Sequence, residues 1–256
     1  MKVRYYVNKD YEERLHSLVE SIADRGVPVE ADCVFSGRNR IYRLDYDGLK
    51  LSIKAFRKPS FPNKFVYTNI RKSKARRSFE NAEEMLRRDI PTPLPLAWIE
   101  KKKCGSLAES YYICEHSPYE HNLRFWETWD EVERDDVLQA YAKLLLKIHN
   151  KGIQHHDLSP GNVLWMKNAA TGVIEFQIVD LNRMTLKNRP LTEKEAYGNF
   201  RNINLVETET RRLGAIYGKE RGIEQAASGD RAVQVLKADQ KRKQRLHKIK
   251  RIFQPK

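Results

Sequence analysis

The sequence predicts an α+β fold with two lobes: a small β-rich N-terminal lobe with one main helix, and a mainly helical C-terminal lobe. Two observations support this fold class. Residues 31–114 contain several segments with the apolar alternation of strands and a single strong helix-forming segment. Residues 130–151 then show the pattern of a long helix, and a polar loop with reactive side chains follows. Two lobes fill the 256 residues without a further domain.

Four parts are expected along the chain. They are an N-terminal extension (1–30), the N-lobe (31–114), the C-lobe (115–236) and a basic amphipathic C-terminal tail (237–256). In the extension, residues 11–23 are expected to form a helix.

The N-lobe begins with a pattern of strand, turn and strand over residues 34–44, with Gly37 in the turn. Residues 49–56 alternate like a third strand and carry Lys54. The turn can bind a phosphate group through its backbone N–H groups and through Arg38 or Arg40. Because Gly37 is the single certain glycine, the turn alone predicts little more than a hairpin.

Residues 74–88 predict the main N-lobe helix, and the prolines within residues 90–93 stop it. Its three acidic residues are candidates for an ion pair with Lys54: Glu80, Glu83 and Glu84. Helical spacing places Glu83 beside Phe79 and Leu86 on the apolar face. The acidic residues that do not pair are expected on a solvated helix face.

The C-lobe follows a strand at residues 111–116, which is expected to lead into the segment between the lobes. Residues 130–151 predict the central helix of this lobe, and Gly152 ends it.

The loop of residues 155–165 begins with His155 and holds Asp157 and Asn162 five positions apart. Phosphoryl transfer uses such a pair: a carboxylate orients the attacking hydroxyl, and a carboxamide binds a magnesium ion on the triphosphate. The kinase catalytic loop, H-R-D-x-x-x-x-N, has the same spacing. Here His156 replaces the arginine.

A second carboxylate follows at the distance that kinases require. Residues 176–183 are predicted to contain a buried strand that ends at Asp180, where kinases place the metal-binding Asp of D-F-G. The triplet here is Asp180-Leu181-Asn182. In the same comparison, Lys54 takes the place of the lysine that binds the α- and β-phosphates. Singly, each of these residues would be a turn or strand-end residue. Their order along the chain favours a kinase.

The chain resembles the lipopolysaccharide kinase family, which phosphorylates the inner-core sugars Kdo or heptose and is related to RIO and KEOPS-type kinases. The stretches that carry the resemblance are residues 36–39, 52–54, 71–82, 90–93 and 155–164. Two features depart from ordinary protein kinases: Ser159 stands where a lysine is usual, and no Ala-Pro-Glu segment follows Asp180. These departures favour a kinase with a small-molecule, lipid or RIO-like acceptor.

The resemblance implies a protein-kinase-like fold, ATP and Mg²⁺ as cofactors, and a sugar hydroxyl as acceptor, with Kdo on a lipid A precursor favoured. It also implies roles for individual residues. Asp157 would be catalytic with His155 bracing its loop, Gly37, Arg38, Lys54, Glu80 and Glu115 would bind ATP, and Asn162 and Asp180 would bind the metal. Among the acidic residues of the helix, it favours Glu80 over Glu83 as the partner of Lys54.

A formal net charge of +14 predicts an acidic partner, such as an anionic glycolipid or an anionic membrane surface. Two segments concentrate the positive charge, residues 61–77 and residues 241–253. The first interleaves aromatic and basic residues, as at a membrane interface, or is a solvated insertion. The second predicts a basic amphipathic helix with Leu246, Ile249, Ile252 and Phe253 on one face. This helix would bind a membrane or dock on the C-lobe. Nucleic acid is not expected, since no nucleic-acid module is recognised.

The expected location is the cytosol, peripheral to the inner face of the cytoplasmic membrane, because the sequence shows no membrane span and no signal-peptide pattern. Two alternative functions stay open. One is a RIO- or KEOPS-like protein kinase or ATPase. The other is a pseudokinase scaffold that binds a membrane or a partner. The altered triplet and the sparse glycine loop favour this scaffold. It is disfavoured by the retention of Lys54, Asp157, Asn162 and Asp180.

Overall fold

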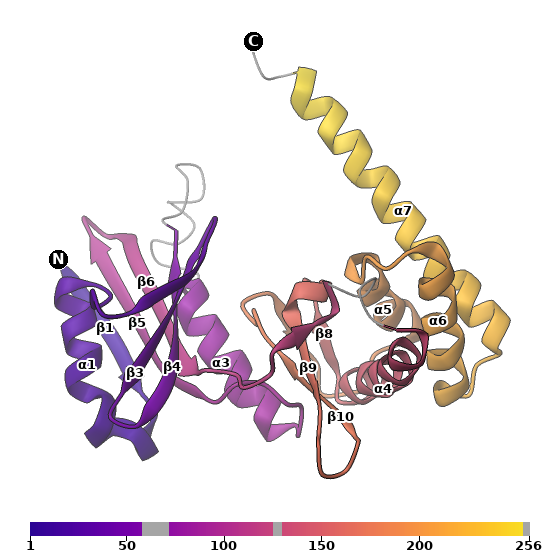
Figure 1. Ribbon diagram of the computed structural model, residues 1–256. Coiled ribbons are helices and arrows are strands. Elements are labelled where there is room, and N and C mark those ends of the chain that lie inside the picture. Colours follow the sequence, from indigo (N-terminus) through magenta and orange to yellow (C-terminus); the bar gives the residue numbers. More distant parts are fainter. Residues whose placement is uncertain (58–71, 125–129, 253–256) are drawn as a thin grey trace. The chain divides into compact units, whose positions relative to one another are not determined.

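The computed structural model describes residues 1–57, 72–124 and 130–252; residues 58–71, 125–129 and 253–256 lie outside this description (Figure 1). The chain forms two compact units. The first comprises residues 1–118 and 177–183, and the second comprises residues 119–176 and 184–256. The predicted segment 61–77 therefore lies largely outside the described residues.

The first unit is built on a six-stranded antiparallel sheet with the strand order β1-β5-β6-β4-β3-β2. Its elements are β1 (Lys2–Val7), η1 (Lys9–Tyr11), α1 (Glu12–Arg25), β2 (Asp32–Ser36), β3 (Arg40–Tyr46), β4 (Leu49–Phe56), α3 (Lys74–Arg87), β5 (Pro95–Lys103) and β6 (Ser106–Glu115). The predicted helix and strands of the N-lobe are present. The segment predicted as an extension supplies β1, which pairs with β5, and α1.

The two helices of this unit cover opposite faces of the sheet (Figure 1). Successive side chains of a strand point to opposite faces. Leu51 and Ile53 of β4 are fully buried in the cluster that contains α1. Phe56 belongs to a second cluster with Phe79 of α3. Lys54, two residues from Phe56, therefore lies on the face that α3 covers.

Helix α3 begins and ends as its sequence predicts. The Ser73 side chain accepts a hydrogen bond from the N–H of Arg76 at 3.1 Å and caps the N-terminus. At the other end Asp89 adopts a left-handed conformation with φ of 60°, and Ile90 and Pro91 follow. A residue before proline avoids the helical conformation, so the helix cannot continue.

The second unit is mainly helical, with two small sheets. Its elements are β7 (His121–Asn122), α4 (Glu131–Asn150), β8 (Ile153–His155), η3 (Pro160–Asn162), β9 (Val163–Lys167), β10 (Ile174–Ile178), β11 (Met184–Leu186), α5 (Glu193–Tyr197), η4 (Gly198–Asn202), α6 (Glu207–Arg221) and α7 (Gln225–Ile252). One sheet has the order β10-β9-β7 and the other pairs β8 with β11. The last two residues of β10 belong to the first unit.

The central helix α4 is the predicted one, and Gly152 ends it. Gly152 has a φ of 71°, and a Cβ atom there would overlap the carbonyl oxygens of Lys187 and Arg189. Only glycine fits this position without strain. The buried face of α4 includes Leu138, Ala142, Leu145 and His149, as expected from their spacing.

The basic tail is the second half of α7. Ala232, Val233 and Leu236 are buried, and residues 241–246 are exposed. On the predicted apolar face, Leu246 is 49% exposed, the side chains of Ile249 and Ile252 are not described, and Phe253 lies beyond the described residues. Within the described chain, every helix is too short or too polar to cross a membrane.

Candidate active site

In the first unit, the structure brings Lys54 and Asp180 together. The Nζ atom of Lys54 lies 2.6 Å from Oδ1 of Asp180, and the two side chains are 15% and 24% exposed. Asp180 sits just past β10 with a φ of 62°, a left-handed conformation that an aspartate adopts only with support from its surroundings. The roles of both residues toward ATP and metal stay predictions.

Two amide side chains hold the turn that contains Asp180. Asn182 donates a hydrogen bond to Oδ1 of Asp180 at 2.5 Å. Asn81 of α3 donates to the carbonyl of Leu181 at 2.6 Å. The residues that replace Phe and Gly of the kinase triplet thus take part in fixing the carboxylate, since Leu181 is buried and Asn182 is 7% exposed.

The predicted ion pair between Lys54 and Glu80 is not formed. Glu80 instead accepts hydrogen bonds from Lys72 at 2.8 Å and from Arg76 at 2.9 Å. Arg76 lies one helical turn before Glu80 and Lys72 lies just before the helix, so both cations reach the carboxylate locally. Burial would raise the pKa of Glu80, but these two cations hold it below the usual range.

Glu83, the second candidate, forms no ion pair with Lys54 either, as far as the described residues show. Partial burial, together with the charge of Glu80, raises the pKa of the Glu83 carboxyl. A carboxylate that paired with Lys54 would show the opposite direction. In this structure, therefore, the carboxylate that contacts Lys54 comes from Asp180.

Lys74 is a candidate site residue that the sequence reasoning missed. The Nζ atoms of Lys54 and Lys74 lie 5.3 and 6.0 Å from the centre of the Phe56 ring. Partial burial lowers the pKa of Lys74, and the positive charges of Arg38, Arg77 and Lys54 lower it further, against the charge of Asp180. These groups form a cationic cluster around one carboxylate, which suits a polyphosphate ligand.

A sequence signal for Lys74 did exist. The first turn of α3 carries Lys74, Arg76 and Arg77 and no acidic residue. The helix dipole disfavours cations at an N-terminus. Arg76 is compensated by its ion pair with Glu80 within the helix, whereas Lys74 forms no ion pair in the described chain. Lys74 at this end of the helix is therefore a candidate for a binding role.

The remaining predicted ATP contacts are Gly37 and Arg38, in the turn between β2 and β3, and Glu115, at the end of β6. The N–H of Gly37 donates to the carbonyl of Asn39 at 3.1 Å, and the Arg38 side chain is exposed. The N–H of Glu115 donates to the carbonyl of Leu94 at 2.9 Å, and that of His116 donates to Lys50 at 2.7 Å. Adenine recognition by Glu115 would thus need an atom other than its N–H.

In the second unit, the predicted catalytic loop is a compact turn after β8. Its buried His155 accepts a hydrogen bond from the N–H of Asp157 at Nδ1, at 3.1 Å. The side-chain amide of Asn162 donates to the carbonyl of Asp157 at 2.8 Å. The His155 ring thus contacts the backbone of Asp157, and its bracing role stays a prediction. The bond from Asn162 also places Asp157 and Asn162 in one turn.

His156, which replaces the kinase arginine, ties the loop to the rest of this unit. Its carbonyl accepts a hydrogen bond from the Asn202 amide at 2.8 Å. Its Nε2 atom lies 2.7 Å from the hydroxyl of Thr185. Asn202, at the end of η4, was not predicted because nothing in its local sequence marks it.

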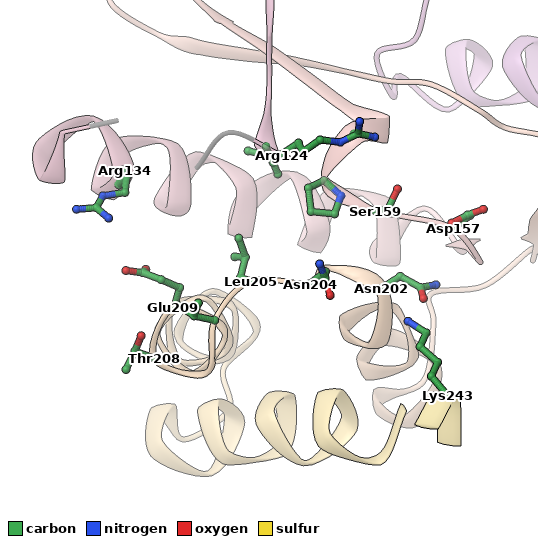
Figure 2. A pocket seen from close by; sticks show the side chains of 14 residues that line it. Arg124, Arg134, Asp157, Ser159, Asn202, Asn204, Leu205, Thr208, Glu209 and Lys243 are labelled. Atoms are coloured by element: carbon green, nitrogen blue, oxygen red, sulfur yellow. The ribbon is translucent and has the colours of Figure 1, made fainter. Parts of the chain in front are cut away.

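A pocket of about 770 Å³ opens beside Asp157 in the second unit. It is lined by residues of the catalytic loop, of η4, of α4, α6 and α7 and of the segments between them: Leu123, Arg124, Arg134, Asp157, Ser159, Pro160, Gly161, Asn202, Asn204, Leu205, Val206, Thr208, Glu209 and Lys243. Figure 2 shows Asp157, Ser159, Asn202 and Lys243 toward one end, and Arg134, Thr208 and Glu209 toward the other. The pocket is large enough for a sugar.

The predicted metal ligands have suitable chemistry for Mg²⁺. Magnesium takes oxygen ligands, commonly one or two from the protein, with phosphate and water completing its shell. Asp180 supplies a carboxylate, and Asn162 uses its amide nitrogen toward Asp157, which leaves its amide oxygen as the ligand atom. No group of three or more His, Cys, Asp or Glu residues that could hold a metal occurs in the described part of the chain.

Comparisons with known proteins extend this picture. A family model described as the lipopolysaccharide kinase (Kdo/WaaP) family matches residues 37–215. A solved structure, "WaaP in complex with acyl carrier protein", is similar with a TM-score of 0.55 and 15% identity, over 91% of this chain and 99% of that chain. No curated protein sequence matches this chain.

A second solved structure is the Rio2 kinase-ADP/Mg²⁺-phosphoaspartate complex from Chaetomium thermophilum. It is similar with a TM-score of 0.50 and 15% identity, over 90% of this chain and 76% of that chain. At this level of identity, both likenesses establish the fold. They confirm the predicted α+β, protein-kinase-like fold with a sheet-based N-lobe and a helical C-lobe.

Proposed function

Because this chain belongs to the lipopolysaccharide kinase (Kdo/WaaP) family, we propose that it transfers the γ-phosphoryl group of ATP to a hydroxyl of a Kdo sugar in the lipopolysaccharide inner core. The family makes the protein a phosphotransferase of lipopolysaccharide biosynthesis. The observation that supports an anionic sugar as acceptor is the pocket beside Asp157, which holds Arg124, Arg134 and Lys243.

Each residue has a defined part in this proposal. Asp157 accepts a hydrogen bond from the acceptor hydroxyl and orients it for attack on the γ-phosphorus. Lys54 binds the nucleotide phosphates, and Lys74 adds a second cation on the same face of the sheet. Asp180 and Asn162 would hold Mg²⁺, which neutralises charge on the phosphates when bound. His155 positions Asp157 through its N–H.

The substitution Asp157→Asn tests the chemistry. It removes the carboxylate and keeps the side-chain size, so we expect turnover to fall about 10²–10⁴-fold with ATP affinity nearly unchanged. Asp136→Asn, at an exposed position of α4, is the matched control. Labelled ATP would be incubated with separate Kdo-lipid, heptose-lipid and protein acceptors. Transfer to heptose or protein, but not to Kdo, would contradict the proposed acceptor. Full turnover by Asp157→Asn would contradict the role of Asp157.

We also propose that the protein works at the cytoplasmic face of the membrane, through the exposed basic side chains of α7. Each cation near an anionic leaflet adds about 1 kcal/mol of attraction. The triple variant Lys241→Gln, Arg245→Gln, Lys248→Gln should sediment less with anionic liposomes than the wild type, most clearly at low salt. Equal sedimentation of the two proteins would contradict attachment through α7.

A further inference from the structure

Helix α7 forms part of the wall of the pocket beside Asp157. Its first half is anchored within the second unit, where Ser228 bonds the hydroxyl of Tyr197 at 2.5 Å and Leu236 is buried. Lys243 follows two turns later and lines the pocket. Figure 2 shows its side chain directed toward Asn202, the residue that bonds the catalytic loop.

A buried carboxylate fixes the position of Lys243. Asp239 is 5% exposed, and its Oδ2 and Oδ1 atoms lie 2.7 Å from Lys243 and 2.7 Å from Arg242, respectively. Two cations share one carboxylate, so this group of three carries a net positive charge. The Lys243 side chain is 53% exposed and has three N–H donors, of which the pair with Asp239 uses one. Its other donors can serve a ligand in the pocket.

Arg124 supplies a second cation from the other side of the pocket. A Cβ atom at Gly161 would overlap the guanidinium of Arg124, so this glycine lets the arginine lie against the catalytic loop. In the described part of the chain, no carboxylate forms an ion pair with Arg124. A guanidinium and an ammonium that flank one cavity favour an anionic ligand, because each forms strong charge-assisted hydrogen bonds with carboxylate or phosphate oxygens.

We propose that Lys243 and Arg124 form an anion subsite that binds an acidic group of the acceptor, a carboxylate or a phosphate, next to the hydroxyl that Asp157 orients. This inference rests on the proposed function and deepens it. It makes the second half of α7 a part of the acceptor site, with a role in substrate specificity that is separate from membrane attachment.

The first test compares acceptors that differ in one charge. Lys243→Gln and Arg124→Gln would be assayed with a soluble Kdo disaccharide, with its carboxyl methyl esters, and with a Kdo-lipid with and without its phosphates. We expect KM for the acceptor to rise about tenfold or more, with KM for ATP unchanged, and Lys243→Arg to retain most of the affinity. Lys219→Gln, at an exposed position of α6 outside the pocket lining, is the matched control.

The bound group is the acceptor charge whose removal raises KM in the wild type and no longer raises it in the variants. If esterification raises KM for the wild type and not for Lys243→Gln, the subsite binds the carboxylate. If removal of the lipid phosphates has this pattern, it binds phosphate. If Lys243→Gln and Arg124→Gln stay within twofold of Lys219→Gln on every acceptor, the inference is wrong.

Binding without transfer separates this inference from the proposed function. Calorimetry would measure the affinity of the wild type and Lys243→Gln for free Kdo and for inorganic phosphate. Weaker binding by the variant, in a protein that phosphorylates no Kdo acceptor, would keep the anion subsite and remove the proposed function. If both proteins bind equally, or if the wild type does not bind, while the wild type transfers phosphate to Kdo, the proposed function is kept and the anion subsite is contradicted.

Discussion

Because His149 is buried, we expect the folded protein to lose stability in mild acid. Its Nε2 atom accepts a hydrogen bond from the Asn199 amide at 3.0 Å, and its Nδ1 atom therefore carries the proton and donates to the hydroxyl of Tyr217 at 2.8 Å. Protonation would place a second proton against a donor and add a charge near Arg221. Burial, and next the charge of Arg221, lower the pKa of His149 to about 3.

The size of the effect follows from proton linkage. In the unfolded chain a histidine has a pKa of about 6.5. Below that pH, His149 therefore binds a proton in the unfolded state and stays unprotonated in the folded state. The contribution of His149 to stability is therefore fully present above pH 6.5 and is lost as the pH falls from there toward the pKa of the folded state. Between pH 7 and pH 5 the loss from this one residue is about 2 kcal/mol. The figure changes little as long as the folded pKa lies below about 4.

Urea denaturation at pH 7, 6 and 5 would measure this loss in the wild type and in His149→Gln. The variant lacks the titrating ring and should lose about 2 kcal/mol less over this range, whatever its stability at pH 7. His16→Gln, which removes an exposed histidine of α1 whose pKa is raised by its hydrogen bond to Glu12, should lose at least as much stability as the wild type. Parallel pH profiles for the wild type and His149→Gln would refute the reasoning.

Two further predictions concern the cationic cluster of the first unit. A double-mutant cycle with Lys54→Met and Asp180→Asn should give a coupling of about 1–3 kcal/mol in the free energy of unfolding, because the pair is largely buried; a coupling near zero would show that the ion pair does not hold in solution. Lys74→Met should raise KM for ATP about tenfold through loss of a phosphate contact. Lys72→Met, which removes an exposed lysine paired with Glu80, should change KM for ATP much less. Equal effects of the two lysine substitutions would contradict a specific role for Lys74.

The sequence predicted the elements whose pattern is local. Strand β4 alternates cleanly, α3 has a capping serine and terminating prolines, and α4 ends at a glycine that needs a positive φ. Strand β5 was missed because it is buried on both faces over most of its length and so does not alternate. Strand β1 was missed for the opposite reason, because five of its six residues are exposed.

The same distinction between local and distant contacts holds for the candidate site. Asp157 and Asn162 lie in one short turn, so their spacing alone placed them together. The partner of Lys54 was mistaken, because Glu80 has two cations close by in the sequence, whereas Asp180 reaches Lys54 through tertiary structure. The pocket residues Asn202 and Lys243 come from distant helical segments, and no local pattern joins them to the catalytic loop.

The first unit cannot be removed from this protein as one continuous piece. Residues 177–183 return to it after the chain has entered the second unit, and they bring Asp180 with them. Thr92 donates to the carbonyl of Ile178 at 2.7 Å, and Asn81 bonds Leu181, so this short segment is fastened along α3 and the turn after it. A gene fragment that ends at residue 118 would encode the lysine of the ion pair without its carboxylate. Modular exchange of lobes between related kinases would therefore have to carry this seven-residue segment along with the N-terminal piece.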